Sequence, residues 1–424
     1  MPRDATLAGW LAWLETLHPS TIDLGLERVH EVRRALGLAP AFPIITVGGT
    51  NGKGSTCAYL EAILGAAGYK TGLYTSPHLL AYNERVRIAG VDASDADLLA
   101  AFARVEAARG ATSLTYFEFG TLAALEQFVA ANVDVAILEV GLGGRLDAVN
   151  VFDADAAVVT AIDIDHSEYL GTTREAIGFE KAGIFRPGRP AICADPAPPQ
   201  SLLDHAAAIG ANLLRLGVDF DLTGDGAALA YRGPRWRVTD LPRPAMAGSV
   251  QWRNAAAALA ALEALAARVP VGVAAIRQGL GSARVAGRFQ VIAKRPEIVL
   301  DVAHNPQAAR ALAGTLGERD AAGRTLAVVG MLADKDAAGV VDALAAHVDT
   351  WFVATPDSPR ALAAARLAEV IRERCPGAAV RAFASPADAL DAARSAAREN
   401  DRIVVFGSFY TVAAALTHHA ATEQ

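Results

Sequence analysis

Residues 42–56 read FPIITVGGTNGKGST, and this stretch contains the pattern that decides the fold. Phe42 to Val47 is a short apolar run, Gly48 to Gly54 is a glycine-rich turn, and a helical pattern follows from Ser55 to about Gly68. A turn between a strand and a helix lets backbone N–H groups and the helix dipole bind phosphate oxygens. The stretch therefore predicts a phosphate-binding loop in which Lys53 supplies the positive charge.

The loop departs from the standard P-loop in two places. Val47 stands where the standard pattern has its first glycine, and Gly54 stands where a Ser or Thr directly follows the lysine. Ser55 comes one position later. A glycine-rich turn with a solvated lysine is the alternative interpretation, but the position between a strand and a helix favours phosphate binding.

Strands and helices alternate on both sides of this loop. Helical spacing is expected in residues 1–40, 98–108 and 121–131, and buried strands at 71–74, 133–140 and 156–162. Such alternation indicates a mostly parallel sheet covered on both faces. Residues 195–250 carry clustered Pro and Gly with short β-like pieces, which predicts an antiparallel extension of the first domain.

A second alternation follows the alanine-rich helix expected at 254–267. Strands are predicted at the five ranges 297–301, 325–330, 349–354, 380–383 and 402–406. A chain of 424 residues is also too long for one hydrophobic core. We expect an α/β protein with a P-loop ATPase-like, mostly parallel domain at 1–282 and a smaller Rossmann-like α/β domain at 283–424.

Composition narrows the class of protein. The net charge of −7 argues against a general nucleic-acid-binding surface, which would be basic. Three well-separated cysteines predict neither a disulfide framework nor a cysteine metal site, which favours a reducing, cytoplasmic compartment. The first residues show no secretory signal, and the apolar stretches are too short for membrane spans.

Polar residues are expected at the carboxyl edge of the first sheet, where active sites of open α/β folds form. Glu139 ends a buried strand, and beside a phosphate loop it is a natural Mg²⁺ ligand. His166 follows the next strand, although a locally bonded loop histidine is an equal alternative. Glu180 and Lys181 can equally form the charged face of a helix, and spacing alone assigns Lys181 no role.

Taken together, these segments resemble the folylpolyglutamate and dihydrofolate synthases of the Mur ligase superfamily. The resemblance runs in family order from about residue 20 to 412. The matching stretches are Gly49–Ser55 (GTNGKGS), Thr75–Leu79 (TSPHL), Leu138–Asp147 (LEVGLGGRLD), Asp165-His166, Glu180–Ile184 (EKAGI), Gly287–Gln290 (GRFQ), Asp301–Pro306 (DVAHNP), Gly330–Asp336 (GMLADKD) and Gly407–Phe409 (GSF).

The resemblance implies an ATP site and a metal site. The nucleotide-binding residues would be Asn51, Gly52, Lys53, Gly54, Ser55, Asn254, Arg288 and Asp301. Ser76, Glu139 and His166 look like ligands of Mg²⁺, of which two ions are expected. Lys181 matches a family lysine that CO₂ converts to a carbamate, an anionic ligand for the second ion. Lys53, Lys181 and His304 would be the catalytic residues.

The resemblance also implies the substrates. Ile22, Asp23, Leu24 and Gly25 look like one pterin-binding loop of the bifunctional bacterial enzymes, and Thr115, Tyr116, Phe117 and Glu118 like another. Leu146, Asp147 and Ala148 would complete the acceptor site, and His304 and Ser408 would hold the incoming glutamate. Tyr116 and Phe117 can alternatively be core residues ahead of a helix. The expected reaction joins L-glutamate to dihydropteroate and to reduced folates, in a protein expected to be a monomer.

One departure and two alternatives stand beside this interpretation. Many relatives carry a His-Gln pair before the asparagine that Asn254 matches, whereas this chain has only Gln251 nearby. A cell-wall-type Mur ligase acting on a nucleotide-linked acid is the first alternative, and the pterin-loop segments argue against it. A nucleotide-driven switch without ligation is the second, and it would leave residues 301–306 unexplained.

Overall fold

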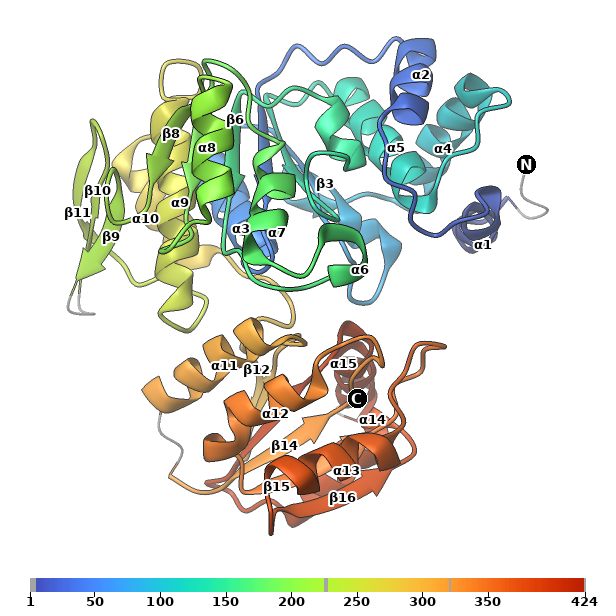
Figure 1. The fold of residues 1–424 in the computed structure, drawn as a ribbon, viewed down its shortest axis with the longest axis vertical. Coiled ribbons are helices and arrows are strands. Elements are labelled where there is room, and N and C mark those ends of the chain that lie inside the picture. Colours follow the sequence, from blue (N-terminus) through green and yellow to red (C-terminus); the bar gives the residue numbers. More distant parts are fainter. Residues whose placement is uncertain (1–4, 225–227, 320–321, 423–424) are drawn as a thin grey trace. The chain divides into compact units, whose positions relative to one another are not determined.

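The computed structural model describes residues 5–224, 228–319 and 322–422, which form two compact units. Unit 1 comprises residues up to 245 and 252–283, and unit 2 comprises 246–251 and residues from 284 onward. Among the described residues, no helix is long and apolar enough to cross a membrane. Each unit has its own sheet, so the predicted class of two α/β sheet domains is confirmed (Figure 1).

Unit 1 is built on an eight-stranded sheet in the order β4-β3-β2-β5-β1-β6-β7-β8. All neighbours from β2 to β8 pair in parallel, and β3 and β4 add an antiparallel edge. The strands are β1 (Ile44–Gly48), β2 (Thr71–Tyr74), β3 (Val86–Ile88), β4 (Val91–Asp92), β5 (Val135–Glu139), β6 (Ala156–Val159), β7 (Pro190–Cys193) and β8 (Asn212–Arg215). Every residue of β1 and β5 is buried, as expected for central parallel strands.

Helices pack around this sheet, and in Figure 1 α4 and α5 lie together. Alternate strand residues such as Ile44 and Leu138 belong to one core cluster with apolar side chains of α1, α2, α4 and α5. The helices are α1 (Leu7–Leu17), α2 (Glu27–Leu36), α3 (Lys53–Ala66), α4 (Asp95–Arg109), α5 (Tyr116–Ala130), α6 (Ser167–Leu170), α7 (Arg174–Ala182), α8 (Gln200–Ala208), α9 (Val250–Ala264) and α10 (Val273–Ser282). Two short 3₁₀ helices are η1 (Tyr82–Arg85) and η2 (Ala148–Val151).

The prediction for residues 195–250 was partly wrong. Residues 200–215 hold helix α8 and strand β8, and β8 pairs in parallel with β7. The antiparallel part begins later, as a separate three-stranded sheet of β9 (Asp221–Gly224), β10 (Leu229–Arg232) and β11 (Arg237–Leu241). The four residues of β8 are too few to show a periodicity, which is why sequence reasoning missed the strand.

Unit 2 has a six-stranded sheet in the order β12-β13-β17-β14-β15-β16. Its strands are β12 (Gln290–Lys294), β13 (Glu297–Leu300), β14 (Thr325–Val329), β15 (Thr350–Ala354), β16 (Ala379–Phe383) and β17 (Arg402–Phe406). All pairs are parallel except β12 with β13, a hairpin that the sequence analysis missed. The helices are α11 (Pro306–Glu318), α12 (Ala337–Leu344), α13 (Ala364–Arg374), α14 (Pro386–Ala396) and α15 (Phe409–Thr422), with the 3₁₀ helix η3 (Ala345–His347).

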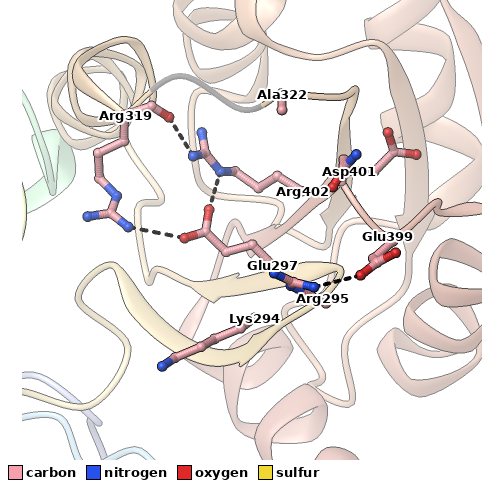
Figure 2. A pocket seen from close by; sticks show the side chains of 9 residues that line it. Lys294, Arg295, Glu297, Arg319, Ala322, Glu399, Asp401 and Arg402 are labelled. Carbon is pink, nitrogen blue, oxygen red and sulfur yellow. Dashed lines mark hydrogen bonds and ion pairs between the residues drawn. The ribbon is translucent and has the colours of Figure 1, made fainter.

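Charged residues line a cavity of about 460 Å³ at the amino ends of β13 and β17 (Figure 2). Arg402 is only 4% exposed, and its Nε donates to Glu297 Oε2 at 2.5 Å. Arg319 binds the other oxygen of Glu297 at 3.1 Å. The Arg295–Glu399 pair at the same cavity is exposed on both sides. Because Arg402 is withdrawn from water, its partner Glu297 has more influence on stability than Glu399.

We therefore predict that Glu297→Ala destabilises unit 2 by about 2–4 kcal/mol, because it leaves a buried guanidinium without a counter-charge. Glu399→Ala, which removes an exposed pair, should change stability by less than about 0.5 kcal/mol. Hydrogen exchange of the β17 amides measures both effects in the full chain. Equal protection of β17 in the two variants would show that the Glu297 pair is not structural.

Candidate active site

The glycine-rich turn forms a loop around the amino end of α3. Gly52 is the N-cap residue of α3 with φ +92°, and a Cβ at this position would lie 2.5 Å from Asn254 Oδ1. Gly49 has φ +142°, and its Cβ would meet the hydroxyl of Thr160. Neither position can hold a side chain, so the backbone N–H groups at the start of α3 stay accessible to phosphate oxygens.

Lys53 folds back over the loop. Its Nζ donates to the carbonyl of Gly49 at 3.0 Å and to that of Thr50 at 3.3 Å. These contacts hold the ammonium group against the loop, where a phosphate would displace them. Ser55 is buried within the first turn of α3. The loop therefore has the backbone geometry and the charge that phosphate binding requires.

Two predicted metal ligands lie together at the carboxyl edge of the sheet. The backbone N–H of Ser76 donates to Glu139 Oε2 at 3.3 Å. Glu139 ends β5 and is 5% exposed, and a Cβ on Gly54 would lie 3.8 Å from both of its carboxylate oxygens. A carboxylate and a serine beside a phosphate loop form a donor set that fits Mg²⁺.

His166, the third predicted metal ligand, begins α6 on an exposed turn and has φ +51°. Its backbone N–H donates to Asp165 Oδ1 at 2.9 Å. Within the part of the chain that the structure describes, no group of three or more His, Cys, Asp or Glu side chains is arranged to hold a metal ion. The set of Ser76, Glu139 and His166 contains only two such residues, so its role as a metal site stays a prediction.

Lys181 is buried in the last turn of α7, with an exposed fraction of 3%. Burial and the nearby charge of Lys53 lower the pKa of its amine to about 7, although Asp165 and Asp147 oppose the shift. Burial also raises the pKa of Asp147 to about 6, against hydrogen bonds from the backbone N–H groups of Leu142 and Val149. Lys181 therefore differs from a lysine on a solvated helical face, because it is buried and its amine loses a proton more readily.

The two predicted pterin segments are joined by one arginine. Arg28 on α2 donates from Nη1 to Asp23 Oδ2 at 2.8 Å and from Nη2 to Glu118 Oε1 at 2.9 Å. His18 Nε2 is 3.1 Å from the same Asp23 oxygen. Burial lowers the pKa of Arg28, but the hydrogen bonds and charges of Glu118 and Asp23 together outweigh that effect and raise it. Residues 22–25 and 115–118 are thus held together by a chain of charge-assisted hydrogen bonds.

The second pterin segment is the start of a helix and not a loop, which corrects the sequence analysis. Thr115 is the N-cap of α5, and Tyr116, Phe117 and Glu118 form its first turn. Thr115 Oγ1 accepts from the N–H of Glu118 at 3.2 Å, and Glu118 Oε2 accepts from that of Thr115 at 2.7 Å. This is a capping box, and the letters T-x-x-E at 115–118 already carried its signature.

Tyr116 and Phe117 are neither fully buried nor exposed. The Phe117 ring lies 5.8 Å from that of Tyr74, and a Cβ on Gly141 would lie 2.7 Å from it. Tyr116 makes an edge contact with Tyr82 at 5.8 Å. Leu146 is half-buried, and Asp147 and Ala148 are buried at the start of η2. Part of each aromatic ring packs against the unit, and part remains available to a flat ligand.

The carboxyl edge of the second sheet gathers the residues predicted in unit 2. Asp301 is half-buried after β13 and accepts from the backbone N–H groups of Phe289 and Ala303, each at 2.9 Å. Burial raises its pKa, and the charge of Arg288 opposes that shift. His304 Nδ1 lies 2.8 Å from the carbonyl of Val302, which places the lone pair of a neutral imidazole on Nε2.

Ser408 lies beside this group because β17 pairs with both β13 and β14. Its hydroxyl accepts from the N–H of Thr411 at 3.1 Å, and it lies 2.8 Å from the Thr411 hydroxyl, which donates to the carbonyl of Gly330. The guanidinium of Arg288 lies 5.7 Å from the ring centre of Phe409. Asp301, His304, Ser408 and Arg288 therefore share one edge of unit 2, whereas Asn254 belongs to unit 1 beside Gly52.

Residues 47–218 match the Mur ligase middle domain, and residues 287–409 match the Mur ligase glutamate ligase domain. The dihydrofolate synthase/folylpolyglutamate synthase of Escherichia coli strain K12 is 49% identical over 408 residues, which cover 96% of this chain and 94% of that protein. The chain belongs to the dihydrofolate synthase/folylpolyglutamate synthase family. The resemblance stated from the sequence is thereby confirmed, together with membership of an ATP-dependent ligase family.

Solved structures of the family share the fold. The structure described as E. coli FolC in complex with DHPP and ADP has a TM-score of 0.94 and 48% identity and covers 99% of both chains. A bifunctional folylpolyglutamate synthase/dihydrofolate synthase with Mn, AMPPNP and L-glutamate bound has a TM-score of 0.91 and 47% identity and covers 100% of both chains. These relatives bind nucleotide, and the second also binds a divalent metal ion.

Arg28, His18 and Thr160 were missed by sequence reasoning, because each contacts a residue distant in the chain, namely Glu118, Ser113 and Asn51 respectively. The contribution of the Arg28 ion pairs to stability can be measured by double-mutant cycles, in which each variant is unfolded in denaturant. Arg28→Met combined with Glu118→Gln should show a coupling energy of about 1–3 kcal/mol, because Glu118 is buried.

The matched control is the cycle of Arg28→Met with Asp23→Asn, whose carboxylate is 40% exposed. Solvent screens that pair, so its coupling should stay below about 1 kcal/mol. A coupling to Glu118 no larger than the coupling to Asp23 would contradict the assignment of Arg28 as the connection to a buried carboxylate.

Proposed function

We propose that this protein uses ATP to join L-glutamate to dihydropteroate, giving dihydrofolate, and to the glutamate tail of reduced folates. The observation that carries the proposal is the Asp23–Arg28–Glu118 chain, which fixes both pterin segments in the unit that holds the phosphate loop. The names of the relatives support both activities, and the DHPP, nucleotide and L-glutamate in their structures support the substrate classes.

The reaction needs activation because a carboxylate does not react with an amine at neutral pH. Transfer of the γ-phosphoryl group of ATP to the acceptor carboxylate gives an acyl phosphate, and the glutamate amine then displaces phosphate. ATP and the acceptor are both anions, so their approach is unfavourable without positive charge. Lys53 and the N–H groups of the loop supply that charge in unit 1, and Arg288 is proposed to supply it from unit 2.

We propose that Ser76, Glu139 and His166 hold a divalent cation. The support is the donor set at the carboxyl edge, where Glu139 contacts Ser76 and lies beside Gly54. When bound, Mg²⁺ offsets the charge of the phosphate oxygens during transfer.

We also propose that Lys181 carries a CO₂-derived carbamate that contributes a ligand for a second Mg²⁺. Only a neutral amine attacks CO₂, and burial lowers the pKa of Lys181 to about 7, so the reactive form is present at neutral pH. The carbamate nitrogen keeps one proton, and the other is lost to solvent, so the side chain changes from a cation to an anion. An anion at this position would reverse the repulsion between Lys181 and Lys53.

In unit 2, we propose that Asp301 contacts the nucleotide and that His304 and Ser408 hold the incoming glutamate. The support is their shared place at the carboxyl edge of the second sheet, where ligands of open α/β folds bind. We further propose a cytoplasmic monomer that binds no nucleic acid, with functional domains at 1–282 and 283–424. The net charge of −7 supports the absence of nucleic-acid binding, and the free cysteines Cys57, Cys193 and Cys375 support the cytoplasmic location.

The decisive experiment measures ADP release with dihydropteroate, and separately with tetrahydrofolate, each in the presence of L-glutamate. We expect turnover with both acceptors and at most a trace when either the acceptor or glutamate is omitted. Lys53→Ala should abolish both activities in a folded protein, because both use one phosphate loop. Turnover of tetrahydrofolate alone would remove the dihydrofolate synthase activity from the proposal, and near-normal turnover in Lys53→Ala would contradict the loop assignment.

For the carbamate, we predict that Lys181→Ala loses activity and regains part of it with added short carboxylic acids, which can occupy the empty anion position. The activity of the native protein under limiting CO₂ should rise as the pH increases through about 7, because the amine must lose its proton first. Rescue by alkylammonium compounds instead of carboxylates would show that Lys181 works as a cation.

A further inference from the structure

Arg85 ends the 3₁₀ helix η1 between the Ser76 loop and the second pterin segment. Its backbone carbonyl accepts from the N–H of Thr75 at 2.9 Å, one residue before Ser76. Its guanidinium carbon lies 5.5 Å from the ring centre of Tyr116 and 5.4 Å from that of Tyr82. The two rings hold the guanidinium by cation–π attraction and restrict its plane.

The remaining contacts of Arg85 leave one edge of the guanidinium unused. Nε donates to His78 Nδ1 at 2.8 Å. Within the described parts of the chain, no carboxylate pairs with Arg85, and Nη1 and Nη2 have no hydrogen-bond acceptor. The adjacent carboxylate of Glu84 accepts instead from the backbone N–H groups of Leu79, Leu80 and Ala81. The two terminal nitrogens therefore present a pair of parallel donors, the arrangement that matches a carboxylate.

Three other arginines of unit 1 already have acidic partners. Arg28 binds Asp23 and Glu118, Arg145 binds Glu180 through two nitrogens, and Arg174 binds Asp195. Arg85 differs from all three because its counter-charge is missing from the described protein. A partly buried arginine without a counter-charge is a candidate binding group for an anionic ligand.

The two proposed acceptors differ by one anion near the reacting end. Dihydropteroate has a single carboxylate, and that carboxylate is the reacting one. A folate acceptor reacts at the γ-carboxylate of its terminal glutamate and also carries an α-carboxylate. Four carbon–carbon bonds separate the carbons of the two carboxyl groups, so these carbons lie within about 5 Å of each other. The backbone of Arg85 is hydrogen-bonded to Thr75, and the next residue, Ser76, contacts Glu139, so the Arg85 side chain starts beside the loop where the acceptor carboxylate is proposed to react.

We propose that Arg85 binds the α-carboxylate of the acceptor's terminal glutamate, so that it serves folate extension and not the dihydropteroate reaction. The proposal rests on the proposed function. His78 is a positioning residue, because by accepting the hydrogen bond from Nε–H it directs the Nη1 and Nη2 edge towards the ligand. Arg85 is thus a specificity-determining residue between two acceptors that share the remaining machinery.

The test compares kcat/KM for tetrahydrofolate and for dihydropteroate in Arg85→Gln. We expect a fall of about tenfold to a hundredfold with tetrahydrofolate, mainly through KM, and of less than about threefold with dihydropteroate. Arg85→Lys, which keeps the charge without the paired donors, should recover part of the loss. Arg104→Gln, which removes an arginine paired with Glu126 on α5, is the matched control and should leave both values unchanged.

A change in the ligand separates a direct contact from a structural effect. The native protein should extend poorly a tetrahydrofolate whose α-carboxylate is replaced by a carboxamide. Arg85→Gln should not lower kcat/KM for this carboxamide acceptor any further. This second measurement keeps the proposal testable if Arg85→Gln does not fold, because the native protein and Arg85→Lys suffice.

Equal losses with both acceptors, or a further loss with the carboxamide, would overturn the α-carboxylate contact. No loss in Arg85→Gln would remove Arg85 from the acceptor site. If the native protein turned over neither acceptor, the proposed function itself would fail, and that result is distinguishable because it appears without any substitution.

Discussion

The hydroxyl group of Thr160 at the end of β6 is the contact on which the phosphate loop depends. It lies 2.8 Å from the carbonyl of Asn51 and 3.2 Å from that of Gly48, and the N–H of Thr50 donates to Ala161 at 2.7 Å. The loop is therefore fixed at its base by a strand that is not adjacent to it in sequence. Because Gly49 packs directly on this hydroxyl, the turn has little freedom to open, and its N–H groups are oriented before any ligand arrives.

The parallel sheet brings the other candidate site residues of unit 1 to the same edge as the phosphate loop. Strands β5, β1 and β6 are neighbours, so the residues that follow them meet at one edge. Buried ionisable groups gather there, namely Glu139, Asp147 and Lys181. Burial of charge is costly, and it raises the pKa of Asp147 and lowers that of Lys181. Such groups contribute little to stability, and their presence at one edge is explained by chemistry performed there.

The sequence predicted the layers and the phosphate loop because these follow from local patterns. Apolar runs of four or more residues, broken by glycine turns, located β1, β2 and β5 within one or two residues, and they located the start of β6 but placed its end three residues too late. The predicted ends of helices and strands were wrong where a side-chain contact or a pairing partner decides them. Helix α5 begins at Tyr116 because Thr115 and Glu118 cap it, and β12 is defined by its pairing with β13. The site was predictable as a set of residues through family resemblance, whereas Arg28, Arg85 and the burial of Lys181 depend on contacts that no local pattern contains.

The shared arginine between the two pterin segments constrains how acceptor specificity can be transferred between family members. Arg28 satisfies one carboxylate from residues 22–25 and another from a helix start 90 residues away. A chimera that exchanges only residues 22–25 would keep the buried Glu118 and its partner Arg28. Arg28 would then face a segment in which the second carboxylate, that of Asp23, has been replaced. The two segments and Arg28 therefore behave as one transferable module, and grafts that respect this boundary have the better prospect of folding with a new acceptor preference.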